Sequence, residues 1–252
     1  MPTKKLADQV KAPTIEEVGI YLNGIFVRAD SSWTVLQAAR AHGFDIPTLC
    51  YHPDLPSEGH CRLCLVEVGE GERTRLVNSC TYPVGKELQV QTHSERVMQA
   101  RRMVLELLLA RAPAAELIKD LAAQHGEYET RFHIEDPEER CILCGQCVRT
   151  CREIVGVSAI CMANRTPDKQ VSTPFKEESE ACIGCGSCAF ICPTNVIPYT
   201  EKDGIRTIWG RDFELQACRV CGNYIAPKAQ IEYWAELTGD PVESFLVCRD
   251  CR

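Results

Sequence analysis

The spacing of the cysteines constrains this chain more than any other feature. Four cysteines recur after 41 residues, so that Cys141, Cys144, Cys147 and Cys151 are repeated as Cys182, Cys185, Cys188 and Cys192. An internal repeat of this kind predicts two copies of one structural unit that pack as a pseudo-symmetric pair. The chain has 17 cysteines in 252 residues, and its first residues contain neither an apolar signal region nor a twin arginine. We therefore expect a reducing, cytoplasmic location in which closely spaced cysteines bind metal and do not form disulfides.

The repeat has the spacing of bacterial ferredoxins, C-x2-C-x2-C-x3-C-P, in which three thiolates bind one [4Fe–4S] cluster and the fourth binds the other cluster. The second run, "CIGCGSCAFICP", matches this pattern including Pro193, whereas the first run has Arg152 in place of the proline. The alternative is that the same thiolates bind zinc, but zinc sites rarely combine eight cysteines in this spacing. Crossed ligation assigns one cluster to Cys141, Cys144, Cys147 and Cys192, and the other to Cys151, Cys182, Cys185 and Cys188.

A second group of cysteines, upstream of the repeat, consists of Cys50, Cys61, Cys64 and Cys80. Ten, two and fifteen residues separate them, whereas plant-type [2Fe–2S] ferredoxins have four residues between the first two cysteines. The sequence before them predicts two strands around an Asn23-Gly24 turn, and then a helix with Ser31 or Ser32 as its N-terminal cap and Gly43 at its end. Further strands are predicted in "RLCLVEV" and "ELQVQT". This order of elements fits a β-grasp ferredoxin domain.

Residues 18 to about 200 resemble the large iron–sulfur subunit of complex I and the matching subunits of NAD-linked [NiFe] hydrogenases, [FeFe] hydrogenases and formate dehydrogenases. Besides the repeat, the resemblance is carried by "NGIFVRADSSWTVLQAARAHGFDIPTLCYH", "CRLCLVEV" and "RRMVLELLLA". It implies that the upstream quartet binds a [2Fe–2S] cluster, and zinc is disfavoured there because the surrounding residues also fit the cluster-binding fold.

The chain departs from this family at one site. In the family, a histidine and three cysteines usually follow the "LELLLA" helix and bind a further [4Fe–4S] cluster. Here no cysteine lies between Cys80 and Cys141, and His125 and His133 have no thiol partners in the sequence. We therefore expect this cluster to be absent. Electron transfer between the remaining clusters would then require either a direct step between the [2Fe–2S] centre and a [4Fe–4S] cluster, or a different packing of the domains.

The C-terminal region contains two Cys-x2-Cys pairs, Cys218/Cys221 and Cys248/Cys251, around a predicted helix in "APKAQIEYWAELTG". Four thiolates can complete a tetrahedron around Zn²⁺ with no open position, and such a site is structural. A [4Fe–4S] or [2Fe–2S] cluster, or a rubredoxin-like iron, would use the same ligands, because spacing alone does not select the metal. We favour zinc. The remaining cysteine, Cys161, is predicted to be a small buried residue on a strand.

Together these patterns predict an α+β chain of five parts. The parts are an N-terminal arm (1–17), a [2Fe–2S] β-grasp domain (18–93), a helical linker (94–138), a two-[4Fe–4S] ferredoxin domain (139–204) and a zinc-ribbon-like tail (205–252). The linker is expected to contain one helix over 94–111, capped by Ser94, and another over 114–125 that ends at Gly126.

Several features argue against catalysis by the chain alone. No stretch matches a dinucleotide or phosphate loop, and no motif identifies an acid–base pair. Every predicted iron site has four cysteines, which leaves no coordination position for a substrate.

The net charge of −7 disfavours nucleic acid, and the longest apolar run, "MVLELLLA", is too short to span a membrane.

Iron–sulfur clusters with complete cysteine ligand sets chiefly transfer single electrons. The resemblance therefore implies an electron-transfer subunit of a multi-subunit oxidoreductase. Its partners would be an NAD(P)-binding flavoprotein subunit and a catalytic subunit of the hydrogenase or formate dehydrogenase type. The alternatives are a redox enzyme in its own right, and a stand-alone redox sensor or assembly scaffold whose clusters are structural.

Overall fold

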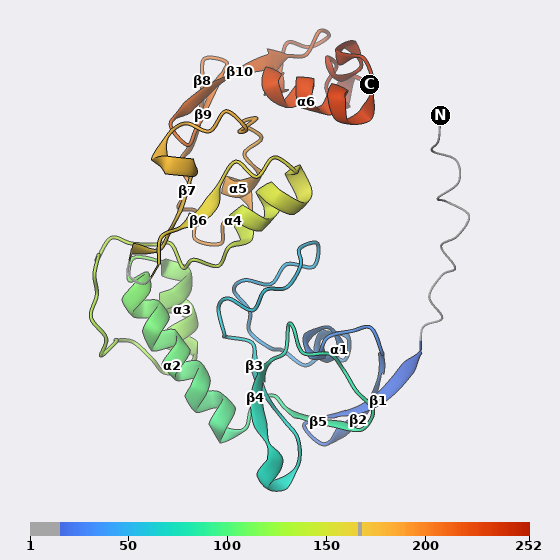
Figure 1. The fold of residues 1–252 in the computed structure, drawn as a ribbon, viewed down its shortest axis with the longest axis vertical. Coiled ribbons are helices and arrows are strands. Elements are labelled where there is room, and N and C mark those ends of the chain that lie inside the picture. The colour runs from blue at the N-terminus through green and yellow to red at the C-terminus, as the bar shows by residue number, and fades with distance from the viewer. Residues whose placement is uncertain (1–15, 166–167) are drawn as a thin grey trace. The chain divides into compact units, whose positions relative to one another are not determined.

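The computed structural model describes residues 16–165 and 168–252, so most of the predicted arm over 1–17 lies outside the described residues. The chain divides into two compact units (Figure 1). One unit comprises the described residues up to Thr48 together with Arg62–Val104. The other comprises Leu49–Cys61 together with Leu105–Arg252. The loop that contains Cys50 and Cys61 therefore belongs to the second unit, whereas Cys64 and Cys80 belong to the first.

The first unit is built on a five-stranded sheet with the order β2-β1-β5-β3-β4. β1 pairs in parallel with β5, and the other neighbouring strands are antiparallel. The strands are β1 (Glu17–Leu22), β2 (Ile25–Asp30), β3 (Leu65–Val68), β4 (Arg75–Asn78) and β5 (Leu88–Gln91), with a short 3₁₀ helix at Gly71–Arg73. Ile20, Leu22, Val66 and Val90 are fully buried along the sheet. Burial of such a side chain contributes about 1.5–3 kcal/mol, which fixes the register of the strands.

Helix α1 (Val35–Ala41) begins later than the sequence predicts. Its N-cap is Thr34, whose hydroxyl accepts a hydrogen bond from the Gln37 amide at 3.3 Å, while the Gln37 side chain accepts one from the Thr34 amide at 2.8 Å. The predicted cap residues are wrong because Ser32 is engaged elsewhere: its amide and hydroxyl both donate to Asp30. The two hydrogen bonds between Thr34 and Gln37 form a reciprocal capping box, which satisfies the backbone amides of both residues at the start of the helix.

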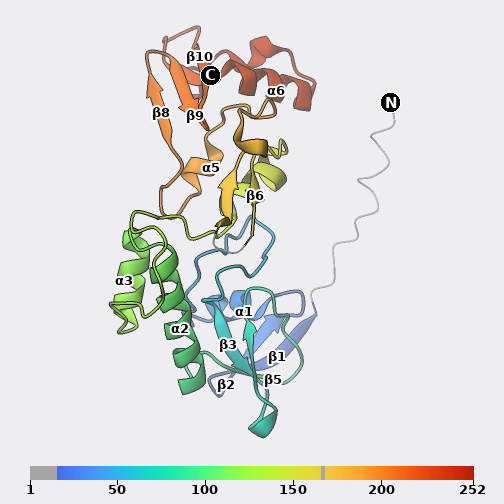
Figure 2. The ribbon, with the colours of Figure 1, turned by 60° about the vertical axis from the view of Figure 1, so that its left-hand side comes forward.

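Helix α2 (Glu95–Arg111) continues the chain from the first unit into the second, and α3 (Glu116–Gln124) follows it. The Ser94 hydroxyl accepts a hydrogen bond from the Val97 amide at 3.3 Å, as predicted for a cap. Figures 1 and 2 both show α3 alongside the end of α2. Among the described residues, no helix is both long enough and apolar enough to cross a membrane.

The cysteine repeat forms two short helices in the second unit. α4 (Gln146–Arg149) is followed by one turn of π-helix at Thr150–Val155, and α5 (Ser187–Phe190) is its counterpart in the second run. Each helix is preceded by a glycine in the left-handed region, Gly145 with φ +73° and Gly186 with φ +77°. A two-stranded sheet of β6 (Cys161–Ala163) and β7 (Gln170–Ser172) and a 3₁₀ turn at Pro174–Lys176 lie between the runs.

A four-stranded antiparallel sheet that the sequence did not predict follows the repeat. It has the order β11-β10-β9-β8, and its strands are β8 (Tyr199–Lys202), β9 (Ile205–Ile208), β10 (Arg211–Ala217) and β11 (Tyr224–Pro227). α6 (Lys228–Thr238) is the predicted C-terminal helix, and 3₁₀ turns at Val242–Phe245 and Arg249–Cys251 follow it. Ile208 and Phe213 of this sheet are buried in one core with Cys147, Cys151 and Cys188. The sheet therefore packs against the cysteine repeat.

Candidate iron–sulfur and metal sites

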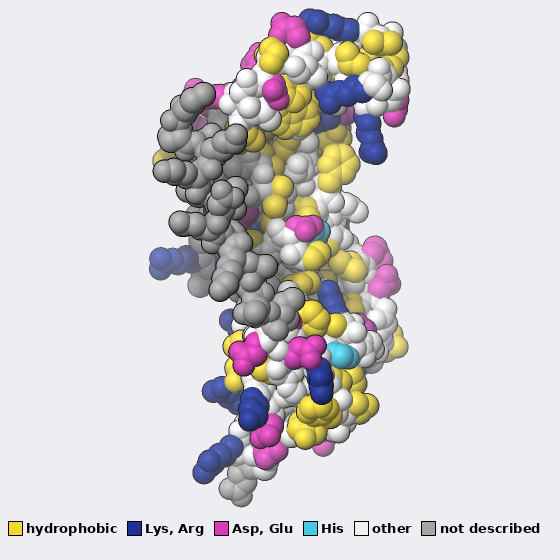
Figure 3. Space-filling view, turned by 90° about the vertical axis from the view of Figure 1, so that its right-hand side faces the viewer, with side chains coloured by type: hydrophobic (Ala, Val, Ile, Leu, Met, Phe, Trp, Pro, Cys, Tyr) yellow, Lys and Arg dark blue, Asp and Glu magenta, His cyan; other side chains and the backbone are white. Residues whose placement is uncertain are grey.

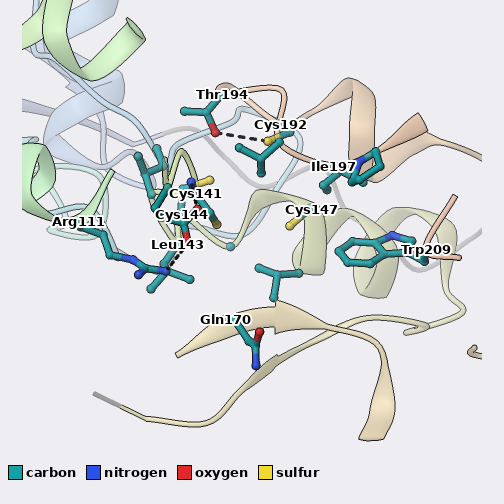
Figure 4. Close-up of a pocket in the computed structure, with 16 residues that line it drawn as sticks. Arg111, Cys141, Leu143, Cys144, Cys147, Gln170, Cys192, Thr194, Ile197 and Trp209 are labelled. Carbon is teal, nitrogen blue, oxygen red and sulfur yellow. Dashed lines mark hydrogen bonds and ion pairs between the residues drawn. The ribbon is translucent and has the colours of Figure 1, made fainter. Parts of the chain in front are cut away.

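The eight cysteines of the repeat line two cavities, four cysteines to each. The larger cavity, of about 230 Å³, is shown in Figure 4. Neither cavity shares a cysteine with the other, and each contains three cysteines of one run and the last cysteine of the other run. The first is lined by Cys141, Cys144, Cys147 and Cys192, and the second by Cys151, Cys182, Cys185 and Cys188. These are the two groups that crossed ligation assigns to the two clusters.

Glycines allow the runs to turn closely around these cavities. A Cβ atom added to Gly184 would lie 2.5 Å from the Phe213 ring, and one added to Gly186 would lie 2.7 Å from the Tyr199 ring. Both glycines have positive φ, a region that glycine adopts without the steric cost other residues incur. The second run is thus held against the C-terminal sheet at positions where no larger residue fits.

Several hydrogen-bond donors point at the cysteine sulfurs. The Ala159 amide donates to Cys151 Sγ at 3.2 Å, and the Trp209 indole N–H donates to Cys188 Sγ at 3.4 Å. Cys192 Sγ lies 3.6 Å from the Thr194 hydroxyl. Donors to a sulfur stabilise its negative charge and are one of the means by which proteins adjust cluster potentials.

Burial makes three thiols of the repeat poor acids without a bound metal. It raises the pKa of Cys144 to about 11, that of Cys147 to about 12 and that of Cys188 to about 11. Repulsion from neighbouring cysteines acts in the same direction in all three cases. Iron and zinc bind thiolates, so positively charged metal ions would compensate the charge that the buried cavity disfavours. The donor set of each cavity therefore fits an iron–sulfur cluster.

The upstream quartet is divided between the two units. Within the first unit, Cys64 Sγ and Cys80 Sγ lie 3.4 Å apart. Within the second, the Cys61 amide donates to Cys50 Sγ at 3.5 Å. All four cysteines are buried. Two thiolates on one tetrahedral metal ion lie about 3.8 Å apart, from metal–sulfur bonds of about 2.3 Å, so the Cys64–Cys80 pair has the spacing of two ligands of one ion.

The loop Leu49–Cys61 is held against the first run of the repeat. Gln146 of α4 donates to the Leu49 carbonyl at 2.9 Å. Arg149 donates to the carbonyls of Cys50 and Pro56, and only 1% of its surface is exposed. A Cβ atom on Gly145 would lie 3.3 Å from the His60 ring. The loop that carries two cysteines of one quartet thus contacts the helix that carries Cys147 of another.

A second buried arginine lies beside the cysteines of the first unit. Arg101 of α2 donates to the Leu65 carbonyl at 2.8 Å, next to Cys64. Burial lowers the pKa of Arg101, and the negative groups of Cys64 and Asp45 act in the opposite direction. No sequence motif assigns a function to Arg101, Gln146 or Arg149. For Gln146 and Arg149 the sequence does contain a signal: both are polar residues placed between cysteines that must be buried to bind a cluster.

The C-terminal cysteines form a compact group. The Sγ atoms of Cys218, Cys221, Cys248 and Cys251 all lie within 4.8 Å of one another. Cys221 Sγ and Cys248 Sγ are 3.7 Å apart. Cys218 follows β10, and its sulfur accepts hydrogen bonds from the amides of Cys248 at 3.3 Å and Val220 at 3.5 Å. The turn that carries the first pair ends at Gly222, with φ +77°.

Hydrogen bonds shift the pKa values of two C-terminal thiols in opposite directions. Amide donors, first that of Cys248, lower the pKa of Cys218 to about 6. Hydrogen bonds with Cys248 and Cys221 raise the pKa of Cys251 to about 12. Without a cation, Cys218 therefore favours the thiolate form, whereas Cys251 favours the neutral thiol. A tetrahedral metal ion supplies the positive charge that allows four thiolates to coexist, so the residues fit such an ion.

The remaining candidates lie apart from these groups. Cys161 is on a strand, β6, as predicted, but it is exposed, so the prediction of a buried residue is wrong. Its neighbours Ala159 and Ile160 enter the core instead. His125 Nδ1 lies 3.1 Å from the Leu121 carbonyl, and His133 pairs with Glu135 at 3.6 Å.

On the face shown in Figure 3, outside the grey area, basic and acidic side chains are interspersed.

Two family models match the chain. Residues 16–95 match the 2Fe-2S iron-sulfur cluster binding domain, and residues 140–196 match the 4Fe-4S dicluster domain. These ranges contain the upstream quartet and the repeat, and they confirm the predicted fold class. Both ranges end before the four-stranded sheet and the C-terminal cysteine group.

Comparisons of the whole chain identify related proteins. The NADH-ubiquinone oxidoreductase 75 kDa subunit of Reclinomonas americana is 31% identical over 223 residues, which cover 79% of this chain and 31% of that protein. The NADPH-Fe(3+) oxidoreductase subunit alpha of Geobacter sulfurreducens is 30% identical over 239 residues, which cover 86% of this chain and 28% of that protein. This chain thus spans less than a third of the length of these curated relatives.

A solved structure is also similar. It is a chain in the crystal structure of the NAD+-reducing [NiFe]-hydrogenase in the H2-reduced state. The sequence identity is 32% and the TM-score is 0.55, over 62% of this chain and 74% of that chain. The resemblance that the sequence indicated is confirmed by these three proteins.

Proposed function

This chain belongs to the family of iron–sulfur subunits that includes the complex I 75 kDa proteins and the matched hydrogenase chain, and we propose that it relays single electrons within a multi-subunit oxidoreductase. One partner with which it exchanges electrons is an NAD(P)-binding flavoprotein subunit. The other partner is a catalytic subunit of the hydrogenase or formate dehydrogenase type. The observation that carries the proposal is the pair of cavities, each lined by one complete crossed cysteine set.

We assign a [4Fe–4S] cluster to each cavity, because each presents four buried or half-buried thiols in the spacing of the bacterial ferredoxin run. The [2Fe–2S] cluster is assigned to Cys50, Cys61, Cys64 and Cys80. Support for it comes from the matched domain over 16–95, which includes all four cysteines, and from the spacing of the Cys64–Cys80 pair. When bound, these clusters accept and release single electrons.

The C-terminal group is assigned to one zinc ion. Around a single tetrahedral ion with metal–sulfur bonds of about 2.3 Å, sulfur atoms lie about 3.8 Å apart. Cys221 and Cys248 lie 3.7 Å apart, and all four sulfurs fit within 4.8 Å. A [4Fe–4S] cluster binds each thiolate at a different iron corner and so requires a wider separation. Among the described residues, these four cysteines form a group whose spacing suits a single metal ion.

The step between the [2Fe–2S] centre and the repeat is proposed to be direct. Its support is the loop Leu49–Cys61, which is held by Gln146 and Arg149 of the run that carries Cys144 and Cys147. Both side chains bind backbone carbonyls and therefore fix the path of the loop without occupying a metal ligand. Their burial also excludes water from this contact.

Metal analysis combined with EPR of the dithionite-reduced protein tests the cluster assignment. We expect about ten iron and ten sulfide ions and about one zinc ion per chain, with one [2Fe–2S] and two [4Fe–4S] signals. About fourteen iron ions and no zinc would contradict the zinc assignment in favour of a third [4Fe–4S] cluster.

A reduction assay tests the relay itself. NADH alone should leave the clusters oxidised, and addition of an NADH-oxidising flavoprotein subunit should allow NADH to reduce them. Oxidation of NADH by this chain without any flavoprotein would instead make it an enzyme in its own right. Clusters that dithionite reduces but that no flavoprotein reduces would favour a structural or sensing function.

A further inference from the structure

The turn between β9 and β10 has an unusual residue at its first position. Three two-residue hairpin turns in the described chain have positive φ at both central residues: Asn23-Gly24, Asp203-Gly204 and Trp209-Gly210. The φ values of their first residues are +51°, +53° and +54°. Asn and Asp tolerate this left-handed conformation, whereas it is strained for a bulky residue such as tryptophan. The hairpin alone therefore favours Asn or Asp at position 209, and a different requirement must account for the indole.

The indole of Trp209 lies between the two sites assigned to [4Fe–4S] clusters. It lines both cavities. Its Nε1–H donates to Cys188 Sγ at 3.4 Å, and the ring packs on the core that contains Cys147 and Cys151. In Figure 4 the ring lies at the Cys147 end of the first cavity, opposite Arg111. Strained residues of this kind concentrate at functional sites, where the surrounding structure holds them in place.

We propose that Trp209 sets the reduction potential of the cluster held by Cys151, Cys182, Cys185 and Cys188. The inference rests on the proposed function, because it requires a [4Fe–4S] cluster in the second cavity. Reduction adds negative charge to a cluster and its thiolates, and an N–H donor to one thiolate stabilises the reduced form more than the oxidised form. The hydrogen bond to Cys188 therefore raises the potential of the second cluster. Trp209 is a positioning residue that acts through Cys188 and is not a ligand.

The strongest competing explanation is that the indole only fills space between the cavities. Substitution Trp209→Phe separates the two explanations, because phenylalanine retains an aromatic ring of similar shape and lacks the N–H donor. Trp234→Phe is the matched control. Trp234 is also half-buried and packs on Phe245 in the core of α6, which contains no cysteine of the repeat.

The test is an EPR-monitored redox titration of the intact, cluster-loaded chain and both variants. In Trp209→Phe we expect one [4Fe–4S] cluster to become harder to reduce by about tenfold in its equilibrium constant, or ~59 mV for one electron, with the other cluster unchanged. Trp234→Phe should leave both potentials unchanged. Unchanged potentials in Trp209→Phe, or an equal shift of both clusters, would overturn the inference.

A second variant keeps the test decisive if Trp209→Phe loses a cluster. Trp209→His retains a ring N–H donor at this position, and it should keep the second cluster closer to the wild-type potential than Trp209→Leu does. Equal potentials in these two variants would also overturn the inference. Failure of the proposed function is seen separately, because the wild-type chain would then lack one or both [4Fe–4S] signals before any variant is compared.

Discussion

Crossed ligation makes Cys151 the most informative single residue in the repeat. It lies in the first run, yet it lines the second cavity with Cys182, Cys185 and Cys188. In Cys151→Ala we expect loss or conversion of the second [4Fe–4S] cluster, because one iron loses its thiolate, while the first cluster keeps its four ligands. EPR of the reduced protein and the iron content measure this effect.

The control for this substitution is available in the same chain. Cys161→Ala removes an exposed cysteine that belongs to none of the assigned groups, so its spectra should match those of the wild type. An intact signal from the second cluster in Cys151→Ala, together with damage to the first, would contradict the crossed assignment.

Arg149 provides a second prediction at the residue scale. Its guanidinium donates to the carbonyls of Cys50 and Pro56 from a position that is 1% exposed. In Arg149→Met both carbonyls lose a charged donor, which we expect to reduce the free energy of unfolding by about 2–4 kcal/mol. The same change should weaken retention of the [2Fe–2S] cluster, because Cys50 is on the released loop. Thermal unfolding and the [2Fe–2S] EPR intensity are the measurements.

Arg152→Met is the control for Arg149. Arg152 is half-exposed and pairs with Glu58 at 2.9 Å, so its loss should cost less than about 1 kcal/mol. Equal effects of the two substitutions would show that the buried donor to the Cys50 carbonyl has no special importance for the loop.

Sequence reasoning identified the residues that follow a chemical spacing rule and missed those that depend on tertiary contacts. The quartets were visible because thiolate ligands of a cluster recur at fixed intervals. Arg101, Arg149 and Trp209 have no such rule, since each is defined by a carbonyl or sulfur far away in the sequence. The helix start at Thr34 was missed for a local reason: three hydroxyl residues precede the helix, and only the structure shows that Ser32 is bound to Asp30.

At the level of secondary structure, the contact between the second run and the C-terminal sheet can be tested at Gly184. Its φ is +67°, and a Cβ atom would lie 2.5 Å from the buried ring of Phe213. Gly184→Ala therefore combines a left-handed conformation with a steric clash, and we expect a loss of about 2–4 kcal/mol in the free energy of unfolding. Denaturant unfolding of the cluster-free chain measures this effect without interference from iron.

Gly239→Ala is the matched control for this prediction. Gly239 ends α6 with φ +75°, and no atom lies within 4 Å of its added Cβ. It therefore reports the conformational cost alone, about 1 kcal/mol. A loss in Gly184→Ala no larger than that in Gly239→Ala would show that the sheet yields and does not hold the run closely.

Elements were predicted best where a strong local signal marks both ends. β1, β2 and α2 were expected because the Asn23-Gly24 turn and the Ser94 cap define them, and the structure contains them. The sheet β8–β11 was missed because its strands are short and mix charged with apolar residues, as in "YTEK" and "RDFELQA". Its stability comes from packing of Ile208 and Phe213 on the repeat, which no local pattern reveals.

At the scale of the whole molecule, the chain combines cysteine groups to which we assign iron–sulfur clusters with one group for which we propose a structural role. The matched domains include the upstream quartet and the repeat, whereas the C-terminal cysteines lie beyond both domains. If the C-terminal ion is zinc, it has no redox chemistry and stabilises the segment that follows β10. This segment includes α6, whose Tyr233 hydroxyl donates to the Val155 carbonyl next to the first run at 2.7 Å.

The double substitution Cys221→Ser/Cys251→Ser tests this division in the intact chain. We expect zinc to fall from about one ion per chain to none, while the iron content and all three cluster signals remain, because no iron ligand has changed. The melting temperature should fall, since the ion no longer joins the turn after β10 to the C-terminal end. Metal analysis, EPR and calorimetry on one preparation measure all three effects. Loss of about four iron ions would identify a third [4Fe–4S] cluster in this group, and loss of about one iron ion would identify a rubredoxin-like centre that itself transfers electrons.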